Sequence, residues 1–577
     1  MAPAAQPLFA DDRPSSAHSE EQAAREDDAL LGNPRKSTQR NRFAGWAQVG
    51  LFAWATVATI AVVVLAVVLH QHVSAPKDSK AKPSGKRNLI FMVSDGMGPA
   101  SLSLTRSYRQ FVDGLPIDDV LVLDQHFIGS SRTRSSNSLV TDSAAGATAF
   151  SCGNKSYNGA ISMLPDHSPC GTVLEAAKKA GYLTGLVVLT AVTDATPACF
   201  ASHVNMRIEE DSIAEQEVGN HPLGRVVDLV LGGGRCHFLP NTTQGSCRAD
   251  GLDVTQLAQE RYGWSYIDKK ADFDALQLGS AVKLPLLGLF APYNFPFKID
   301  RPTSEVYPSL PDMARTAIKA LEAATQDSDK GFFLMIEGSR IDHAGHANDP
   351  ATQVREVLEY DQTFAVVQEF LDRSEVPGVV ISTSDHETGG LATARQLQPL
   401  PAEPEYLWYP KVLADASHSA EYLAHELMSF ITKPGKTPDL KKLEQFVRKD
   451  LVVEGLGIAD ATDDEIDLIL NSPLLSGVYF ADMVSRRAHI GWSTHGHSAV
   501  DVNIYGSKGS DFLHGNHENI EVGRFLREYL DVDVNAITLE LNKKSDSFSI
   551  STSNHVGWTG KVPTEEEIKA AAWRQER

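Results

Sequence analysis

Short apolar runs recur along the chain, and most of them end at or directly before an acidic residue. "NLIFMVS" ends at Asp95, "TGLVVLT" leads to Asp194, "GFFLMIEGS" reaches Glu337 and "GVVISTS" reaches Asp385. A fifth run, "DLVLGGG", leads into a glycine turn. Continuous apolar runs of this length, alternating with helical patterns such as "GTVLEAAKKAG", are typical of buried parallel strands joined by crossover helices. We therefore predict an α/β fold in which helices sandwich a large central, mostly parallel sheet.

The acidic residues at the ends of four runs indicate where a ligand binds. In open α/β sheets, ligands bind beyond the carboxyl ends of the strands. A role in starting a turn explains any one of these acids, but it explains four of them poorly. The pattern therefore favours a functional site at one edge of the predicted sheet.

The stretch from Ala44 to Leu69 carries no charged residue and is long enough to cross a hydrocarbon core. Its apolar core is longer, and begins further from Met1, than that of a cleaved signal peptide. We predict an uncleaved transmembrane helix over 43–69, after a disordered cytosolic tail over 1–42 and before a charged stalk over 70–87. Basic residues flank this helix almost equally on both sides, so charge alone leaves its orientation open.

The N-terminal tail contains "EDDALLG", in which Glu26 precedes Leu30 and Leu31. This pattern resembles the acidic-dileucine signal by which sorting adaptors send membrane proteins to the endosome, lysosome or vacuole. Patterns this short also arise by chance, so both interpretations stay open.

All five cysteines and both Asn-x-Ser/Thr sequons follow the predicted membrane helix. Cys236 and Cys247 flank the polar loop "HFLPNTTQGS", and the odd count leaves one thiol over, for which Cys199 is the best candidate. The other disulfide candidates are Cys152 and Cys170, and the glycosylation candidates are Asn154 and Asn241. These features favour a lumenal main portion, as in a single-pass type II membrane protein, with buried reduced cysteines in a cytosolic domain as the alternative.

The main body is predicted to extend over 88–541, with an insertion at about 395–490 where Pro-rich and acidic helical stretches replace the strand pattern. The polar segment 542–577 is expected to be a peripheral or processed tail. The net charge of −21 argues against a nucleic-acid partner, because phosphate backbones select Lys and Arg surfaces. A small anionic substrate stays open, because a metal cluster can reverse the local field.

Three motifs have the composition of metal-ligand clusters. They are "SDGMG" with Asp95, "EGSRIDHAGH" with Glu337, Asp342, His343 and His346, and "SDHETGG" with Asp385 and His386. Exposed carboxylates and a capping histidine explain any one motif, but three together favour metal. Asp342 and His346 are four residues apart and share one face of a helix, which suits one ion. Imidazole and carboxylate without thiolate indicate catalytic zinc, or manganese. "WSTHGHSAVDVNIYG" offers His495 or His497 as a further ligand.

Six motifs, in order along the chain, resemble those of the alkaline phosphatase family: "SDGMG", "TDSAAGATA", "TDATPA", "LGGGR", "EGSRIDHAGH" and "SDHETGG". The resemblance extends from about Asn88 to about Leu530, and the N-terminal anchor makes the chain most similar to the fungal vacuolar, type II membrane branch. It implies a large central sheet between helices, a homodimer with two active sites, and a place in the vacuole membrane.

The resemblance also implies a role for Ser143, which begins the stretch "SAAGATAF". A serine before an alanine-rich run is most often a helix cap. In the family the matching serine is the nucleophile that becomes phosphorylated, and the arginine matching Arg207 in "HVNMR" grips two phosphate oxygens. A helix start would give Ser143 amide donors and a positive dipole end facing phosphate, so we interpret it as a nucleophile.

Two zinc ions and one magnesium ion per chain are implied by the same resemblance. The ligands of the zinc that lowers the pKa of the serine hydroxyl are expected to be Asp95, Asp385 and His386. Those of the zinc that takes the leaving-group oxygen and then activates water are expected to be Asp342, His346 and His497. The magnesium ligands are expected to be Glu337, Thr196 and Asp95, with Asp194 holding a magnesium-bound water.

Some of these assignments have alternatives. His497 is preferred over His495 because "HSAVDV" matches the family's stretch after its ligand histidine. A turn and a helix cap are the alternatives for Asp194 and Thr196. His343 stands where well-studied bacterial members have lysine, and a histidine titrates near neutrality. The phosphate affinity, the metal preference of the third site and the pH optimum therefore stay open.

The expected activity is metal-dependent hydrolysis of phosphate monoesters through a phosphoserine intermediate, with a broad range of small phosphorylated substrates. Two cations roughly 4 Å apart can stabilise the entering and departing oxygens of an in-line displacement. Two alternatives stay open: a phosphodiesterase or nucleotide pyrophosphatase of the same superfamily, and an inactive membrane-tethered binding ectodomain.

Overall fold

Among the described residues, ten strands form one central sheet in the order β12-β2-β11-β8-β1-β7-β3-β4-β6-β5. The computed structural model describes residues 54, 56–59, 85–303, 305–398, 403–433, 439–545, 548 and 557–571. The strands are β1 (Asn88–Val93), β2 (Phe127–Arg132), β3 (Leu183–Ala191), β4 (Leu229–Gly233), β5 (Ser265–Ile267), β6 (Leu286–Leu289), β7 (Phe332–Glu337), β8 (Gly378–Thr383), β11 (Val502–Gly506) and β12 (Gly515–Glu518). Pairings are parallel except those of β11 with β2 and β8, which confirms the predicted mostly parallel α/β sheet.

The register of the central strands brings the ends of three apolar runs to one edge of the sheet. Val93, at the end of β1, is opposite Glu337 of β7 and Thr383 of β8. Asp95 follows the end of β1, and Asp385 follows the end of β8. Three acidic residues from distant parts of the chain therefore leave the sheet next to one another.

Helices cover both faces of the sheet because the central strands are apolar on both sides. Phe91 and Val93 of β1 pack into a hydrophobic cluster with α5 (Val173–Lys179) and α18 (Asn519–Leu530). Ile90 and Met92 belong to a second cluster, which includes α10 (Leu310–Ala324) and α12 (Pro350–Arg373). The sheet edge that carries the acidic residues is thus supported by packed helices on either side.

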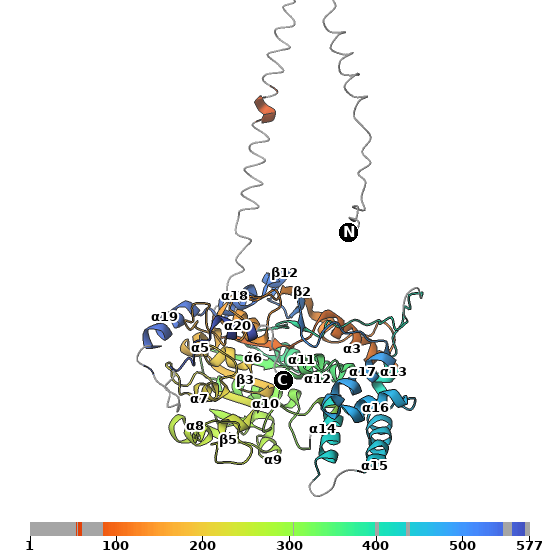
Figure 1. Ribbon diagram of the computed structural model, residues 1–577. Helices are drawn as coiled ribbons and strands as arrows, with labels where there is room; N and C mark the ends of the chain where they lie inside the picture. The colour runs from red at the N-terminus through yellow and green to blue at the C-terminus, as the bar shows by residue number, and fades with distance from the viewer. Residues whose placement is uncertain are drawn as a thin grey trace, which may run out of the picture. The chain divides into compact units, whose positions relative to one another are not determined.

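A further group of helices lies between β9 (Glu387–Thr388) and β10 (His497–Ser498) in the chain. It comprises α13 (Pro410–Asp415), α14 (Ala420–Ile431), α15 (Leu440–Gln445), α16 (Asp463–Asn471) and α17 (Ser476–Ala488). These helices share a hydrophobic cluster in which Leu427 and Phe480 are fully buried. Leu104 of α3 (Pro99–Val112) and Val354 of α12 belong to the same cluster, so the group packs against the sheet-bearing body (Figure 1).

Part of the polar C-terminal segment packs into the body, after α19 (Val534–Ser545). Trp558 is only 2% exposed, and its ring contacts the rings of His203 and His221 edge to face, at 5.7 Å between centroids in both cases. The carbonyl oxygen of Thr559 accepts hydrogen bonds from the backbone and side-chain N–H groups of Asn205. The expectation of a peripheral tail over 542–577 is therefore wrong for this stretch, because one large aromatic ring fills space beside two buried histidines.

Two disulfides lie in the described part of the chain. They join Cys152 to Cys170 and Cys236 to Cys247, and Cys199 is a buried free thiol. The disulfide candidates and the free cysteine predicted from the sequence are confirmed. Both candidate glycosylation residues, Asn154 and Asn241, are exposed.

The predicted N-terminal tail over 1–42, most of the predicted membrane helix over 43–69 and nearly all of the stalk over 70–87 lie outside the described residues. Within the residues that are described, no single helix has the length and apolar composition needed to cross a membrane. One bent pair, Asp463–Asn471 with Pro473–Ala488, meets the requirement only when both helices are combined across a bend of 108°.

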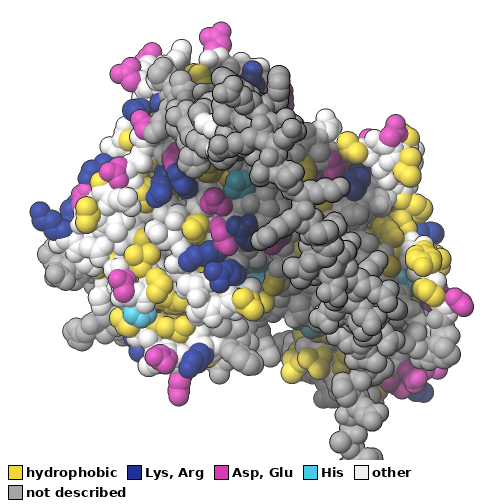
Figure 2. All heavy atoms as spheres, turned by 90° about the horizontal axis from the view of Figure 1, so that it is seen from above, with side chains coloured by type: hydrophobic (Ala, Val, Ile, Leu, Met, Phe, Trp, Pro, Cys, Tyr) yellow, Lys and Arg dark blue, Asp and Glu magenta, His cyan; other side chains and the backbone are white. Residues whose placement is uncertain are grey.

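On the face shown in Figure 2, basic and acidic side chains are interspersed.

Candidate active site

Ser143 is the first residue of α4 (Ser143–Cys152), which begins at the sheet edge. Asp142 caps this helix by accepting a hydrogen bond from the backbone N–H of Ala145. The Ser143 Oγ atom lies 3.0 Å from His386 Nε2. A Cβ atom at Gly146 would lie 2.8 Å from the Cβ of Asp385, so the small residues of α4 allow the helix to approach this loop closely. The serine is thus presented to the residues that follow β8.

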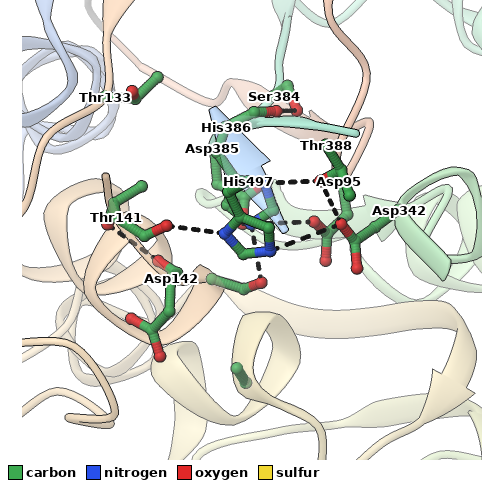
Figure 3. Close-up of polar contacts among 12 residues, drawn as sticks. Asp95, Thr133, Thr141, Asp142, Asp342, Ser384, Asp385, His386, Thr388 and His497 are labelled. Atoms are coloured by element: carbon green, nitrogen blue, oxygen red, sulfur yellow. Dashed lines mark hydrogen bonds and ion pairs between the residues drawn. The ribbon is translucent and has the colours of Figure 1, made fainter. Parts of the chain in front are cut away.

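The first ligand cluster consists of Asp95, Asp385 and His386, whose ligand atoms all lie within 4.8 Å of one another. His386 Nε2 is 3.1 Å from Asp385 Oδ2 and 3.5 Å from Asp95 Oδ1. Burial, together with the negative charges of Asp385 and Asp342, holds the pKa of Asp95 well above its usual range. Figure 3 shows Asp95, Asp385 and His386 close together. This cluster therefore concentrates carboxylates in the interior, and its His386 contacts Ser143.

The second ligand cluster consists of Asp342, His346 and His497. His346 Nε2 is 3.1 Å from Asp342 Oδ2, and His497 Nε2 is 3.3 Å from His346 Nε2 and 3.7 Å from Asp342 Oδ1. His497 Nδ1 donates to the carbonyl oxygen of Thr141, and His346 Nδ1 donates to that of His495, both at 2.7 Å. Since a carbonyl only accepts, both Nδ1 atoms carry a proton, and in the neutral ring each Nε2 atom has a lone pair for a metal ion.

The structure places His497, not His495, among the ligand atoms of this cluster. Asp342 and His346 lie on the short helix α11 (Arg340–His346), four residues apart, as the sequence spacing predicts. His495 is exposed and contributes its backbone carbonyl to His346. His497 belongs to β10, which pairs with β9 directly after Asp385 and His386.

The two clusters adjoin each other. The rings of His386 and His497 stack with centroids 3.4 Å apart and planes 17° apart. Thr388, which sequence reasoning missed, contacts both clusters: its hydroxyl donates to Asp342 Oδ1 and lies 3.2 Å from His386 Nδ1 (Figure 3). Because that hydroxyl proton goes to the carboxylate, Thr388 Oγ accepts from His386 Nδ1, so in the neutral ring Nε2 is the nitrogen left to bind a metal ion. Its place two residues after His386 was the available sequence signal.

Glu337, Asp194 and Thr196 lie close to one another beside the first cluster, near Asp385. Glu337 is buried and accepts a hydrogen bond of 2.6 Å from the Ser339 hydroxyl. Burial raises the pKa of Glu337 to about 8; the hydrogen bond from Ser339 acts against this rise, and the charges of Asp194 and Asp385 act with it. Asp194 caps α6 (Ala195–Ala201), and its charge also acts on Glu337. A helix cap and a position beside the candidate site are therefore compatible roles for Asp194.

Arg207 lies between the start of α6 and the start of α4. Its Nη2 atom donates to Asp194 Oδ1 at 2.8 Å, and its Nη1 atom is 3.6 Å from Asp142 Oδ2. Asp142 caps the helix that Ser143 begins, so the guanidinium is held close to the serine. A planar fork in this position can bind two oxygens of a tetrahedral anion.

His343 lies on α11 between the ligands Asp342 and His346. Its Nδ1 atom is 2.6 Å from Arg340 Nη1, and a guanidinium only donates, so the ring proton is on Nε2. Burial and the adjacent Arg340 charge lower the pKa of His343 to about 4. The guanidinium of Arg340 stacks on Phe297 at 3.7 Å and binds Glu421 of α14 at 3.0 Å, and no sequence pattern indicates these contacts.

The donor atoms of the two clusters fit divalent metal ions. One cluster has two carboxylates and one imidazole, and the other has one carboxylate and two imidazoles, without thiolate. In the described part of the chain, Asp95 Oδ1 and both Asp385 oxygens are buried and lack a hydrogen bond, although His386 Nε2 lies close to two of them. Buried carboxylates are costly unless they are paired or bind a cation, so these oxygens favour a metal site.

Comparison with known proteins agrees with this geometry. A family model described as alkaline phosphatase matches residues 86–532. The repressible alkaline phosphatase of Saccharomyces cerevisiae is 54% identical over 474 residues, which cover 78% of this chain and 83% of that protein. The alkaline phosphatase of Schizosaccharomyces pombe is 47% identical over 528 residues, which cover 90% of this chain and 94% of that protein. The solved structure of Thermus thermophilus alkaline phosphatase is similar with a TM-score of 0.64 and 28% identity, over 79% of this chain and 95% of that one.

The matched segment contains the whole sheet and both ligand clusters. The two fungal relatives are matched over most of their own length as well as most of this chain. The chain therefore belongs to the alkaline phosphatase family and is a phosphatase.

Proposed function

We propose that this protein hydrolyses phosphate monoesters through a phosphoserine intermediate on Ser143, with a broad range of small phosphorylated substrates. The observation that carries the proposal is the position of the Ser143 hydroxyl. It lies 3.0 Å from His386 Nε2, at the start of α4, next to two clusters whose donor atoms suit divalent metal.

Two zinc ions and one magnesium ion per chain are part of this proposal. One zinc would be held by Asp95, Asp385 and His386, the other by Asp342, His346 and His497, and the magnesium by Glu337, Thr196 and Asp95, with Asp194 holding a magnesium-bound water. Two such cations supply the positive charge that stabilises the entering and departing oxygens of an in-line displacement at phosphorus.

Ser143 attacks phosphorus in the first half-reaction. Its Oγ atom forms a bond to phosphorus while the bond to the ester oxygen breaks, the serine proton is lost, and the departing oxygen ends as an alcohol. Water then attacks the phosphoserine, the bond between phosphorus and Oγ breaks, and inorganic phosphate leaves with Ser143 restored. The N-terminal amides of α4 and its dipole support an anion at this position.

Arg207 orients the phosphoryl group for this attack. Its guanidinium is held by Asp194 and lies near Asp142, close to the start of α4, and a planar guanidinium can bind two non-bridging oxygens of a phosphoryl group. His343 carries its ring proton on Nε2, and burial and the Arg340 charge lower its pKa to about 4, which makes it a neutral hydrogen-bond donor near neutral pH.

Hydrolysis of a chromogenic phosphate monoester, measured with and without a chelator, tests the proposal. Turnover is expected to disappear in chelator and to return when zinc and magnesium are added. Equal turnover of a monoester and a diester would instead favour a phosphodiesterase of the same superfamily. An absence of turnover in zinc-loaded protein would favour an inactive binding ectodomain.

We further propose that the chain is a homodimeric, single-pass type II membrane protein of the vacuole. The uncharged stretch from Ala44 to Leu69, the dileucine-like pattern and the two disulfides support this placement. Resistance to alkaline extraction from membranes, a gel shift on glycosidase treatment at Asn154 or Asn241, and a sedimentation mass of two chains are the expected results. Release into the soluble fraction would contradict the anchor.

A further inference from the structure

We propose that Glu387 is a positioning residue that holds three ligand-bearing segments together and sets how tightly the Asp342–His346–His497 cluster binds zinc. The inference rests on the proposed function, since it needs that cluster to be a zinc site. Glu387 follows His386 directly but its side chain belongs to neither cluster, so it would act through its neighbours and not on the substrate.

The Glu387 carboxylate binds the turn after β9 to strand β10. The side chain is in β9 and only 3% exposed. Oε1 accepts a hydrogen bond of 3.1 Å from the backbone N–H of Leu391, and Oε2 accepts one of 3.2 Å from that of Gly390. Oε2 also accepts a hydrogen bond from the Ser498 hydroxyl. One buried carboxylate therefore links residues more than a hundred positions apart in the chain.

The link to Ser498 bears directly on the ligand His497, its neighbour in β10. β9 and β10 form an antiparallel ladder of only two residues each, with Ser498 opposite Glu387 and His497 opposite Thr388. Such a short ladder provides few backbone hydrogen bonds. The charged side-chain bond between Glu387 and Ser498 therefore adds to the backbone hydrogen bond of 2.7 Å from Gly389 N–H to the Gly496 carbonyl oxygen in fixing the backbone beside His497, and hydrogen bonds to a carboxylate are stronger than neutral ones.

Glu387 also contacts the turn that carries Asp95. A Cβ atom at Gly98 would lie 2.2 Å from the Glu387 Cγ atom, so only a glycine leaves room for this side chain. The backbone N–H of Thr388 donates to the carbonyl oxygen of Gly96 at 3.2 Å. The segments that carry Asp95, His386 and His497 thus meet around one side chain.

The physical consequence is an effect on metal affinity. His497 has one ring nitrogen fixed by Thr141 and its ring stacked on His386, so a shift of β10 would move its Nε2 atom away from Asp342 and His346. Residues that orient metal ligands typically change metal affinity by about 10- to 100-fold when they are removed. Once zinc is bound, the reacting groups are unchanged, so kcat at saturating zinc is expected to stay close to that of wild type.

Zinc titration of the metal-depleted full chain against a competing chromophoric chelator tests the inference. Ser498→Ala removes the hydrogen bond from β10 to Glu387, together with a long one of 3.4 Å from the backbone N–H of Val500, whereas Glu387→Gln removes the charge and keeps the shape. Both variants are expected to bind the zinc of the Asp342–His346–His497 cluster about 10- to 100-fold more weakly, with turnover restored by excess zinc. Glu217→Gln is the matched control: its carboxylate is also buried, lies on α7 (Glu210–Val218), and is expected to leave zinc affinity unchanged.

Wild-type zinc affinity in both Ser498→Ala and Glu387→Gln would overturn the inference. So would a loss of turnover that excess zinc does not restore, accompanied by a lower unfolding temperature of the metal-free protein, because that pattern indicates a general structural role. If Glu387→Gln does not fold, the result for Ser498→Ala decides. A wild-type chain that binds no zinc would instead refute the proposed function.

Discussion

The two ligand clusters beside Ser143 differ in how far water can reach them. The side chains of Asp385 and His386 are completely buried, whereas that of His346 is 22% exposed. Those of Asp95, His497 and Asp342, at 11%, 8% and 6%, lie between these extremes, so the contrast is one between His346 and the pair Asp385 and His386. Ser143 contacts the buried cluster. Electrostatic interactions are stronger where water is excluded. The dry cluster, formed by Asp95, Asp385 and His386, therefore suits activation of the proposed nucleophile and stabilisation of the charge that develops in the transition state. The open cluster leaves room for a leaving group and for the water of the second half-reaction.

The carboxylates of the two clusters also differ in charge state. Burial raises the pKa of both Asp95 and Asp342, but the charge of His346, its hydrogen bond to Asp342 and the charge of His497 outweigh burial at Asp342 and bring its pKa well below its usual range. At Asp95 the neighbouring carboxylates act in the same direction as burial. Asp95 therefore depends more on a bound cation than Asp342 does, whereas the adjacent His386 lowers the pKa of Asp385.

Replacement of Ser143, the proposed nucleophile, is expected to have the largest effect on turnover. Ser143→Ala removes the only hydroxyl in contact with His386 Nε2 among the described residues, and kcat is expected to fall by at least about 1000-fold. Zinc content, measured in parallel by atomic absorption, should stay unchanged. A variant that keeps most of the wild-type turnover would show that Ser143 is only a helix cap.

Loss of one ligand from each cluster sharpens the contrast. Asp385→Asn is expected to abolish turnover at every zinc concentration, because water cannot replace a ligand in a completely buried position. His346→Gln is expected to regain part of its turnover as zinc is raised, because solvent reaches this position. Steady-state kcat against zinc concentration measures both. Equal rescue of the two variants would remove the distinction between a dry and an open cluster.

Substitution of Arg207 is expected to have an intermediate effect. Arg207→Ala removes charge-assisted hydrogen bonds to phosphate, which should raise KM and the inhibition constant of inorganic phosphate by about 10- to 100-fold, with a smaller effect on kcat. Arg207→Lys is the control, because it keeps the charge and loses the planar fork. An inhibition constant equal to that of wild type in Arg207→Ala would place the phosphate elsewhere.

A smaller effect is expected on the stability of the metal-free protein. Burial raises the pKa of Glu337 to about 8, so the folded state binds a proton there more tightly than the unfolded state does. This contribution to stability is full at acidic pH and is lost as the pH rises through about 8. The unfolding temperature should therefore fall between pH 5.5 and pH 8.5, less so in Glu337→Gln. An unfolding temperature with the same pH dependence in both proteins would refute this role of Glu337.

Much of the fold could be predicted because it depends on local patterns. Continuous apolar runs mark buried strands, and a polar residue directly after such a run marks the edge where ligands bind. Asp95, Glu337 and Asp385 were found in this way, and the structure aligns the three strand ends. The spacing of Asp342 and His346 likewise follows from helix geometry alone.

Contacts between distant segments could not be predicted from the sequence. Thr388 and Glu387 lie inside a recognised motif, but their partners Asp342 and Ser498 are 46 and 111 residues away, and only packing brings them together. Trp558 was missed for a related reason. A polar segment can hold one buried aromatic ring, and average composition does not reveal which ring finds a space in the body.

Anomalous X-ray diffraction at the zinc absorption edge, on crystals of the purified chain, tests the central claim most directly. We predict two zinc peaks roughly 4 Å apart beside the Ser143 hydroxyl, one among Asp95, Asp385 and His386 and the other among Asp342, His346 and His497. Zinc bound only at other residues, or a Ser143 hydroxyl directed away from both clusters, would contradict the account.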